Sequence, residues 1–259
     1  FHGRTFAAMS ATGQEKVQTC YDSMLETFEY LPYNDIDAVK TAIDDNTAAV
    51  MLEIIQGEGG VIPAEAEFLQ QLEAHCKAKD IFLIVDEIQT GIGRTGKPFA
   101  YQHYGLDPDM ITVAKALGNG LPVGALIGKE RFVESFGPGS HGSTFGGNPV
   151  AMAAANAVLD IVFTEDFLRD VQEKSDYLFQ SLHEQLENVS SVTAIRGKGL
   201  MAGIECKDQA GPVIQQLQAK GLLVLSAGAN VIRLLPPLIV SKTDIDTAVS
   251  LIRSELETV

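Results

Sequence analysis

Apolar and amphipathic segments alternate along the first two thirds of this 259-residue chain. Segment 63–79 opens with Pro63 and then repeats apolar residues on one helical face, at Phe68, Leu69 and Leu72. Other runs are short and continuously apolar, as is typical of strands covered on both faces of a sheet; they span 48–55, 81–85, 110–114 and 123–127. Such strands, separated by helices, predict an α/β fold with a largely parallel sheet.

The pattern changes near Pro149, where Asn148 can cap an alanine-rich helix that begins at the proline. A second helix is expected after Thr164, because apolar residues then recur at spacings of three and four. The last helix is expected to begin at Ser241. Short apolar strands lie between these two helices, at 200–205, 222–225 and 231–235. We therefore predict a large domain at 1–160 and a small α+β domain at 161–259.

The composition limits the classes of partner. The formal net charge is −15 at pH 7 and Lys and Arg do not cluster, so we expect neither a nucleic-acid nor an anionic-membrane partner. No apolar run approaches the roughly 18 residues of a membrane-spanning helix. The three cysteines, Cys20, Cys76 and Cys206, are far apart and lack the spacing of metal ligands. They predict reduced thiols, no metal site and a cytoplasmic location.

Residues 91–96, GIGRTG, match the G-x-G-x-x-G pattern of dinucleotide-binding folds. The following residues, Lys97 and Pro98, continue a helix poorly. The acidic residue expected about 20 positions later would fall in the apolar run 110–114, which has no carboxylate. A loop is the favoured interpretation, and a nicotinamide-dependent oxidoreductase is kept as the alternative from another class of enzyme.

Two charged residues stand at the ends of apolar runs. Asp86 follows one predicted strand and Lys115 follows another, among small apolar residues. Each has an ordinary interpretation, because an aspartate can cap a loop and a lysine can extend into solvent. Together they fit pyridoxal phosphate (PLP), which needs a lysine amine for its imine and a carboxylate against its pyridine nitrogen. Ligands also bind at the carboxyl ends of strands in such sheets.

Residues 85–96 (VDEIQTGIGRTG) with 112–115 (TVAK) strongly resemble the class III PLP-dependent aminotransferases. The likeness extends along the chain, through 1–5 (FHGRT), 56–60 (QGEGG), 139–149 (GSHGSTFGGNP), 196–201 (RGKGLM) and 233–237 (RLLPP). It implies the PLP-dependent transferase fold of type I, in which a large domain with a mostly parallel sheet precedes a small α+β domain. The family's N-terminal part, with its phosphate-binding turn, has no counterpart in this sequence. We therefore expect an incomplete large domain, and weak or absent cofactor binding if this chain is all there is. An inactive fragment is kept as an alternative to an active enzyme.

The resemblance assigns the cofactor to particular positions. Lys115 would be the Schiff-base lysine and would move the proton, while Asp86 would pair with the pyridine nitrogen. Phe1 and Ile88 would lie on opposite sides of the ring. The other cofactor-binding positions implied are Glu87, Gln89 at the ring hydroxyl, and Thr144, which would reach the phosphate from the partner subunit of a homodimer.

The resemblance also implies the substrates. The nearest likeness is to members that transfer an amino group from N-acetylornithine to 2-oxoglutarate in arginine biosynthesis, giving N-acetylglutamate 5-semialdehyde and glutamate. Glutamate has two carboxylates, for which Arg4 and Arg233 are the candidates. Glu58 would pair with Arg233 when glutamate is absent, and Ser143 would contact substrate. Ornithine, succinylornithine and 4-aminobutyrate are the alternative substrates.

The five histidines have no carboxylate or thiol at a catalytic spacing in the sequence. We therefore predict that all of them are structural or exposed to solvent: His2, His75, His103, His141 and His183.

Overall fold

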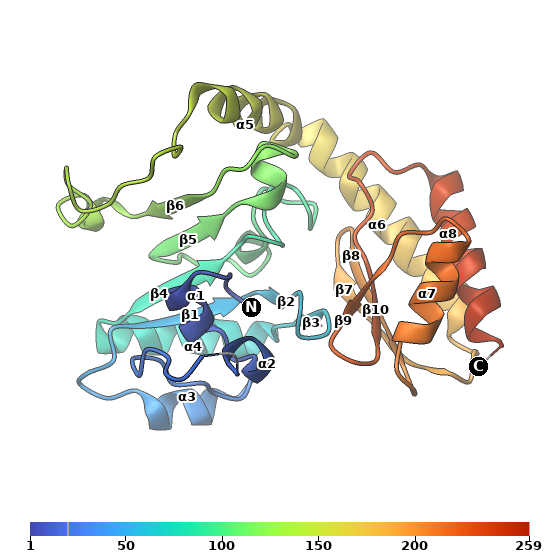
Figure 1. Cartoon of the computed structure of the whole chain (residues 1–259), viewed down its shortest axis with the longest axis horizontal. Coiled ribbons are helices and arrows are strands. Elements are labelled where there is room, and N and C mark those ends of the chain that lie inside the picture. Colours follow the sequence, from blue (N-terminus) through green and yellow to red (C-terminus); the bar gives the residue numbers. More distant parts are fainter. Residues whose placement is uncertain (20, 259) are drawn as a thin grey trace.

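The computed structural model describes residues 1–19 and 21–258, and the prediction for the thiol of Cys20 lies outside them. Two sheets, each with its own hydrophobic core, lie side by side (Figure 1). The first sheet has the order β1-β4-β5-β6 and the second the order β7-β8-β10-β9. The predicted boundary at 160/161 falls in the last turn of helix α5 (Pro149–Val162), and the division into domains stays a prediction.

The first sheet is parallel over three strands and antiparallel at its edge. Its strands are β1 (Ala49–Glu53), β4 (Phe82–Asp86), β5 (Met110–Val113) and β6 (Ala125–Gly128). Strands β1, β4 and β5 run parallel, as the apolar runs predicted, whereas β6 pairs antiparallel with β5. The expectation that the run 123–127 is covered on both faces was wrong, because all four residues of β6 are exposed at the sheet edge.

Two boundaries near the first strand differ from the prediction. Strand β1 ends at Glu53, and β2 (Ile55–Gln56) begins beyond the fully buried Ile54. Pro63 does not open a helix, because it lies in β3 (Ile62–Pro63), which pairs antiparallel with β2. The helix that follows, α4 (Ala66–Lys79), begins three residues later and buries Phe68, Leu69 and Leu72 as predicted.

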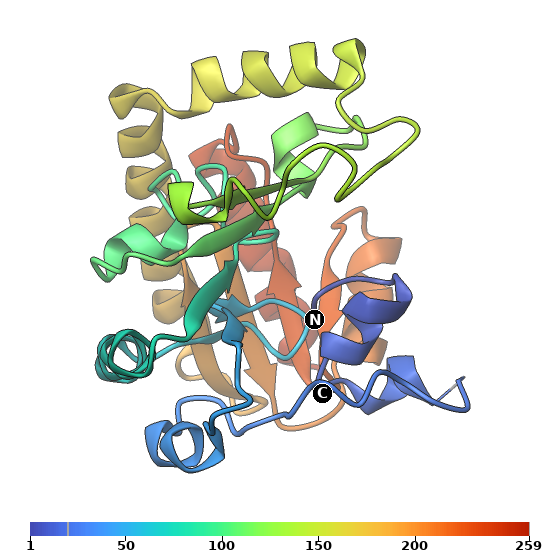
Figure 2. The same cartoon turned by 90° about the vertical axis from the view of Figure 1, so that its left-hand side faces the viewer.

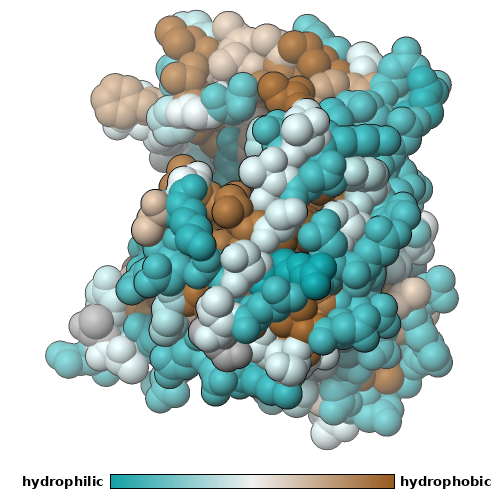
Figure 3. Space-filling view, turned by 90° about the vertical axis from the view of Figure 1, so that its right-hand side faces the viewer, coloured by the Kyte–Doolittle hydropathy of each residue, from teal (hydrophilic) through white to brown (hydrophobic). Residues whose placement is uncertain are grey.

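The second sheet is antiparallel throughout. It consists of β7 (Val192–Lys198), β8 (Met201–Cys206), β9 (Leu225–Ala227) and β10 (Val231–Leu234). Helices α6 (Glu165–Leu186), α7 (Gly211–Ala219) and α8 (Lys242–Leu256) pack beside it. Figure 3 looks onto this side of the molecule, which is largely hydrophilic, as expected for the outer faces of amphipathic helices. Strand β7 was not predicted, because its polar residues interrupt the apolar pattern.

Two of the three residues expected to precede helices, Asn148 and Ser241, form side-chain caps. The Asn148 side chain accepts a hydrogen bond from Ala151 N at 3.0 Å at the start of α5. Ser241 forms a reciprocal capping box with Asp244 at the start of α8. Thr164 does precede α6, but its hydroxyl donates to Ile161 O instead of capping the helix.

The remaining helices surround the first sheet. Helix α5 runs above β6 in both Figure 1 and Figure 2. The short helices are α1 (Phe6–Ala11), α2 (Glu15–Gln18) and α3 (Ile36–Ala42), with 3₁₀ helices at Ala100–His103, Lys115–Gly118 and Glu130–Phe132.

Candidate functional site

Three polar residues form one row across the carboxyl ends of the parallel strands. Glu53 is the register partner of Asp86, which is in turn the partner of Thr112. Paired residues on adjacent strands place their side chains on the same face of a sheet. Glu53 and Asp86 are buried, at 5% and 2% exposed, and Thr112 Oγ1 is a buried atom with no hydrogen-bond partner among the described residues. This row forms one side of the candidate site.

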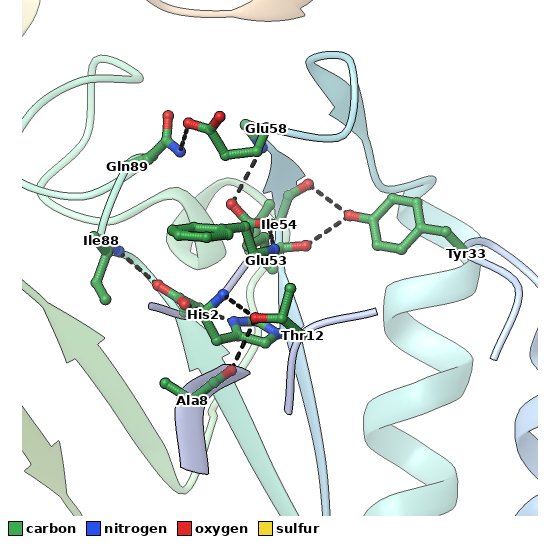
Figure 4. Close-up of polar contacts among 12 residues, drawn as sticks. His2, Ala8, Thr12, Tyr33, Glu53, Ile54, Glu58, Ile88 and Gln89 are labelled. Atoms are coloured by element: carbon green, nitrogen blue, oxygen red, sulfur yellow. Dashed lines mark hydrogen bonds and ion pairs between the residues drawn. The ribbon is translucent and has the colours of Figure 1, made fainter. Parts of the chain in front are cut away.

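Both carboxylate oxygens of Asp86 are held, by His2 and Ile88, which are labelled in Figure 4. Oδ1 accepts from the backbone N of Ile88 at 2.9 Å, and Oδ2 lies 2.7 Å from His2 Nδ1. The backbone N of His2 in turn donates to Thr12 Oγ1 at 3.0 Å. The Asp86 carboxylate is thus held in place by the turn that follows it and by the N-terminal segment.

The prediction that His2 is structural or exposed to solvent did not anticipate its contact with the Asp86 carboxylate. Its partner is 84 positions away in the sequence, so local spacing carried no signal for the pair. The only sequence signal was its place within the FHGRT motif.

Lys115 follows β5 as the first residue of a 3₁₀ helix, with a φ of +46°. Because Thr112 is paired with Asp86, the turn that holds Lys115 begins beside the aspartate, as predicted from the two strand ends. Although the side chain is exposed, the protein atoms around it disfavour its charged form and lower the pKa of the amine. The negative charges of Glu58, Glu53 and Asp86 raise the pKa, but by less. The amine makes no hydrogen bond or ion pair with any residue that the structure describes. It is therefore available as a nucleophile.

Glu53 joins two segments that border the row. Its Oε2 accepts from the backbone N of Phe1 at 3.0 Å, and its Oε1 accepts from Gly57 N at 3.1 Å. The Arg4 guanidinium lies 5.4 Å from the centroid of the Phe1 ring, within the range of a cation–π contact. Phe1 and Arg4 are therefore brought to the same end of the sheet as Asp86.

Arg233 reaches this end from the second sheet. It lies on β10, is 5% exposed, and its Nη1 donates to Gly57 O at 2.9 Å, Glu58 Oε1 at 2.8 Å and Gln89 Oε1 at 3.2 Å. Gln89 Nε2 also donates to Glu58 Oε1 at 3.2 Å. The predicted pairing of Glu58 with Arg233 is present. The Arg233 Nε is buried with no partner in the described part of the chain.

The charge of Arg233 controls the ionisation of Glu58. Partial burial opposes the charged form of Glu58, but the hydrogen bond and the positive charge of Arg233 outweigh it and lower the pKa of this carboxyl. At neutral pH the two side chains therefore form an ion pair that a competing carboxylate could open.

Glu87 is buried beside Asp86 but bonds elsewhere. Its Oε2 accepts from Thr90 Oγ1 at 2.5 Å and its Oε1 from Tyr101 N at 2.9 Å. Burial raises the pKa of this carboxyl. These contacts fix the turn after β4, so we infer that Glu87 shapes the segment that carries Asp86 and Gln89.

Ser143 and Thr144 lie in the exposed segment between β6 and α5. Ser143 Oγ accepts from Gly146 N at 3.1 Å within that segment. The structure does not bring these two residues to Asp86 and Lys115 of the same chain. Their predicted contribution from a partner subunit stays a prediction.

The glycine loop 91–96 is packed against protein atoms. A Cβ on Gly91 would lie 2.7 Å from Glu87 O, and one on Gly93 would lie 2.5 Å from Val162 Cγ1. The loop leads to the 3₁₀ helix Ala100–His103 and not to an α-helix. A pyrophosphate site requires exposed backbone N–H groups at a helix start, so these contacts argue against the nicotinamide alternative.

The described residues offer neither a metal site nor a membrane span. Within 1–19 and 21–258, no group of three or more His, Cys, Asp or Glu side chains is placed to hold a metal ion. No described helix combines the length and the hydropathy needed to cross a bilayer. Cys76 and Cys206 are buried free thiols, and burial raises the pKa of each to about 11.

Comparison with known proteins gives consistent matches. A family model described as aminotransferase class-III matches residues 1–256. An acetylornithine aminotransferase from Bacillus subtilis strain 168 is 58% identical over 257 residues, which cover 99% of this chain and 66% of the relative. The chain thus spans just under two thirds of the length of that relative.

Solved structures of similar fold are also aminotransferases. An N-acetylornithine aminotransferase from Stenotrophomonas maltophilia K279a is 35% identical, with a TM-score of 0.81 over 89% of this chain and 62% of that one. An ornithine aminotransferase from Toxoplasma gondii, described with PLP at partial occupancy in its active site, is 32% identical. Its TM-score is 0.93 over 100% of this chain and 62% of that one. These similarities confirm the predicted α/β fold class.

Proposed function

The chain belongs to the aminotransferase class-III family, and on that premise we propose that it carries out PLP-dependent transamination between N-acetylornithine and 2-oxoglutarate. The products are N-acetylglutamate 5-semialdehyde and glutamate. The observation that carries the proposal is the placement of the Lys115 amine and the Asp86 carboxylate at the ends of adjacent parallel strands. The Bacillus subtilis relative, named acetylornithine aminotransferase, supports this choice of substrate.

The side chains present fit the cofactor. Lys115 has a lowered pKa and no competing hydrogen bond or ion pair among the described residues. Asp86 keeps free lone pairs, because the structure gives each of its oxygens one partner, and the orphaned Thr112 Oγ1 lies in the same row. Lys115 would hold the cofactor covalently, Asp86 would bind its ring nitrogen, Gln89 its ring hydroxyl, and Phe1 and Ile88 would flank the ring. When bound, PLP supplies an electron sink for the carbon that loses its proton.

The chain's own residues divide the remaining tasks. Lys115, whose amine is neutral at a lower pH than an ordinary lysine, would take the proton from the substrate carbon and deliver it to the carbon at the other end of the C=N bond. Asp86 would keep the ring nitrogen protonated, and His2 fixes the direction of the Asp86 carboxylate. Glu87 stabilises the turn between Asp86 and Gln89.

The ion pair of Glu58 and Arg233 suits two substrates of different charge. Glutamate brings a second carboxylate, which would displace Glu58 and bind Arg233 in a two-pronged manner. Acetylornithine has one carboxylate, so Arg233 would stay neutralised by Glu58 while Arg4 binds that carboxylate. Ornithine is the alternative substrate with a structural neighbour to support it.

The cofactor test uses the protein mixed with PLP. We expect a visible absorbance band, and borohydride reduction followed by peptide mapping should find the pyridoxyl label on Lys115. Lys115→Ala should abolish the label, whereas Lys79→Ala, an exposed lysine at the end of α4, should retain it. Loss of the band when acetylornithine or glutamate is added supports transamination. A label spread over surface lysines, or nicotinamide binding without a band, contradicts the proposal.

We also propose a homodimer with a shared site in the cytoplasm. Exposed apolar side chains on β6 and in the segment that follows it support an interface there: Leu126 is 47%, Ile127 48% and Phe145 80% exposed. Mixing inactive Lys115→Ala and Thr144→Asp chains should restore about a quarter of the wild-type activity, because each heterodimer then has one intact site. The absence of any recovery would mean that Thr144 acts within its own chain or not at all.

A further inference from the structure

Arg94 is partly buried and connects the two sheets. Its Nη1 donates to Leu200 O at 2.9 Å and to Pro236 O at 2.6 Å, both in the C-terminal part of the chain. Burial lowers the pKa of this guanidinium to about 10. Arg94 makes no ion pair with a carboxylate in the part of the chain that the structure describes. Its side chain bonds to carbonyl oxygens and not to a carboxylate, so it joins two segments of the chain without neutralising a negative charge.

A backbone contact strengthens the same connection. Leu200 N donates to Arg94 O at 2.9 Å, so each residue bonds to the other. Gly199 has a φ of +65°, and a Cβ there would lie 2.3 Å from both Arg94 O and Thr95 Cα. The turn between β7 and β8 is therefore pressed against loop 91–96 at a distance that only glycine allows.

Both carbonyl acceptors are close in sequence to the strand that carries Arg233. Pro236 lies three residues after Arg233, and Leu200 immediately precedes β8, whose Gly203 is the register partner of Arg233. At its other end, the segment that contains Arg94 begins with Asp86 and includes Gln89, which itself contacts Arg233. Segment 86–94 thus contacts both the first sheet and the strands of the second sheet that carry Arg233.

We propose that Arg94 is a positioning residue for substrate recognition, holding β10 so that the Arg233 guanidinium meets the incoming carboxylate at the correct place. This inference rests on the proposed aminotransferase function. Arg94 does not touch the substrate. It acts through Arg233. The three acceptors of Arg233 Nη1, on Gly57, Glu58 and Gln89, all lie on the side of the first sheet.

The first test measures steady-state kinetics of the PLP-loaded protein. Arg94→Met should raise KM for 2-oxoglutarate about tenfold or more, since displacements on the order of 1 Å remove productive contacts. The Kd for PLP should change less than about twofold, because Lys115 and Asp86 are not displaced. Arg169→Met, which removes an exposed arginine paired with Asp166 on α6, is the matched control and should leave both values unchanged. A KM within about twofold of wild type, or equal losses in PLP and substrate binding, overturns the proposal.

A double variant separates positioning from general destabilisation. If Arg94 acts through Arg233, then adding Arg94→Met to Arg233→Lys should raise KM little beyond the effect of Arg233→Lys alone. If the KM increases of the two single variants multiply in the double variant, the proposal is overturned. Should Arg94→Met fail to fold, Arg94→Lys serves in the same cycle, because it keeps the charge but loses the planar geometry that reaches two carbonyls.

A third measurement does not depend on transamination. Hydrogen exchange of the amides in 197–206 and 231–236 should be faster in Arg94→Met than in wild type and in Arg169→Met, and titration with glutarate should show weaker binding. If wild type lacks transaminase activity but these two changes occur, the proposed function fails and the positioning role stands. Unchanged exchange and unchanged glutarate binding overturn the positioning role even in an active enzyme.

Discussion

The imidazole Nδ1 of His2 lies 2.7 Å from Oδ2 of Asp86, and both side chains are largely buried, at 12% and 2% exposed. The second carboxylate oxygen is held by Ile88 N, so Asp86 cannot rotate without losing a bond. The N-terminal segment and the end of β4 therefore build one unit, although 84 positions separate the pair in the sequence.

The first prediction concerns this pair. His2→Ala should weaken PLP binding roughly tenfold, because a hydrogen bond to a buried carboxylate contributes about 1.5–3 kcal/mol. His2→Asn, which can still donate, should recover part of the affinity. A titration followed by absorbance measures both, with the exposed His183→Ala on α6 as the control. An unchanged affinity in His2→Ala would show that the contact has no part in binding.

Replacing Asp86 by Asn tests its charge without changing its size. The amide cannot keep a ring nitrogen protonated, so kcat should fall by about 10²-fold or more while the label on Lys115 persists. The two quantities are measured by steady-state assay and by borohydride labelling. Full activity of Asp86→Asn would contradict the proposed pairing of this carboxylate with the ring nitrogen.

Glu58→Gln should free Arg233 and change substrate preference. The dicarboxylate 2-oxoglutarate should bind more tightly relative to acetylornithine, by about tenfold, since the competing internal carboxylate is gone. The ratio of the two kcat/KM values measures this. Equal changes for both substrates would mean that Glu58 does not discriminate between them.

The pH dependence of the same pair has a definite sign. The pKa of Glu58 is lowered from its ordinary 4.5 by Arg233, so its stabilising contribution is fully present above that ordinary value and is lost as the pH falls through the lowered one. We therefore expect constant substrate preference across neutral pH. A preference that titrates near neutrality would have to arise from another group.

The pKa of Lys115 is lowered from 10.5, mainly because the surrounding protein atoms displace water from its amine. A lysine with a lowered pKa is neutral at lower pH than a free one, so the rate of PLP attachment should increase with pH and level off below 10.5. Stopped-flow absorbance across this range measures the midpoint. A midpoint at or above that of an ordinary lysine would show that the surrounding protein atoms do not lower the pKa of this amine.

Gly199→Ala tests the close contact between loop 91–96 and the turn after β7. Its Cβ would overlap backbone atoms at 2.3 Å, so we expect a loss of about 3 kcal/mol in the free energy of unfolding. Gly221 also has a positive φ, of +87°, but a Cβ there meets nothing within 4 Å. Gly221→Ala should therefore lose only about 1 kcal/mol, from backbone strain alone. Urea denaturation of both variants measures the difference, and equal losses would mean that the contact is loose.

The sequence alone predicted the helices and strands that depend on interactions between near neighbours in the chain. The cap of Asn148 on α5 and the capping box of Ser241 on α8 depend on side chains within three residues of the helix start. The parallel strands β1, β4 and β5 followed from continuous apolar runs, and their ends located Asp86 and Lys115. The family motifs then identified Glu58 and Arg233, which the structure brings together at 2.8 Å.

Only the tertiary structure decided which distant residues meet. An apolar run such as 125–128 does not specify whether its strand is central or at an exposed edge, because that depends on what lies beside it. The carboxylate partner of His2 and the carbonyl partners of Arg94 are 84 or more positions away, beyond the reach of any spacing in the sequence. Local patterns determine helices, strands and caps, since those arise between near neighbours. The site itself depends on how two sheets pack, which arises only when the whole chain folds.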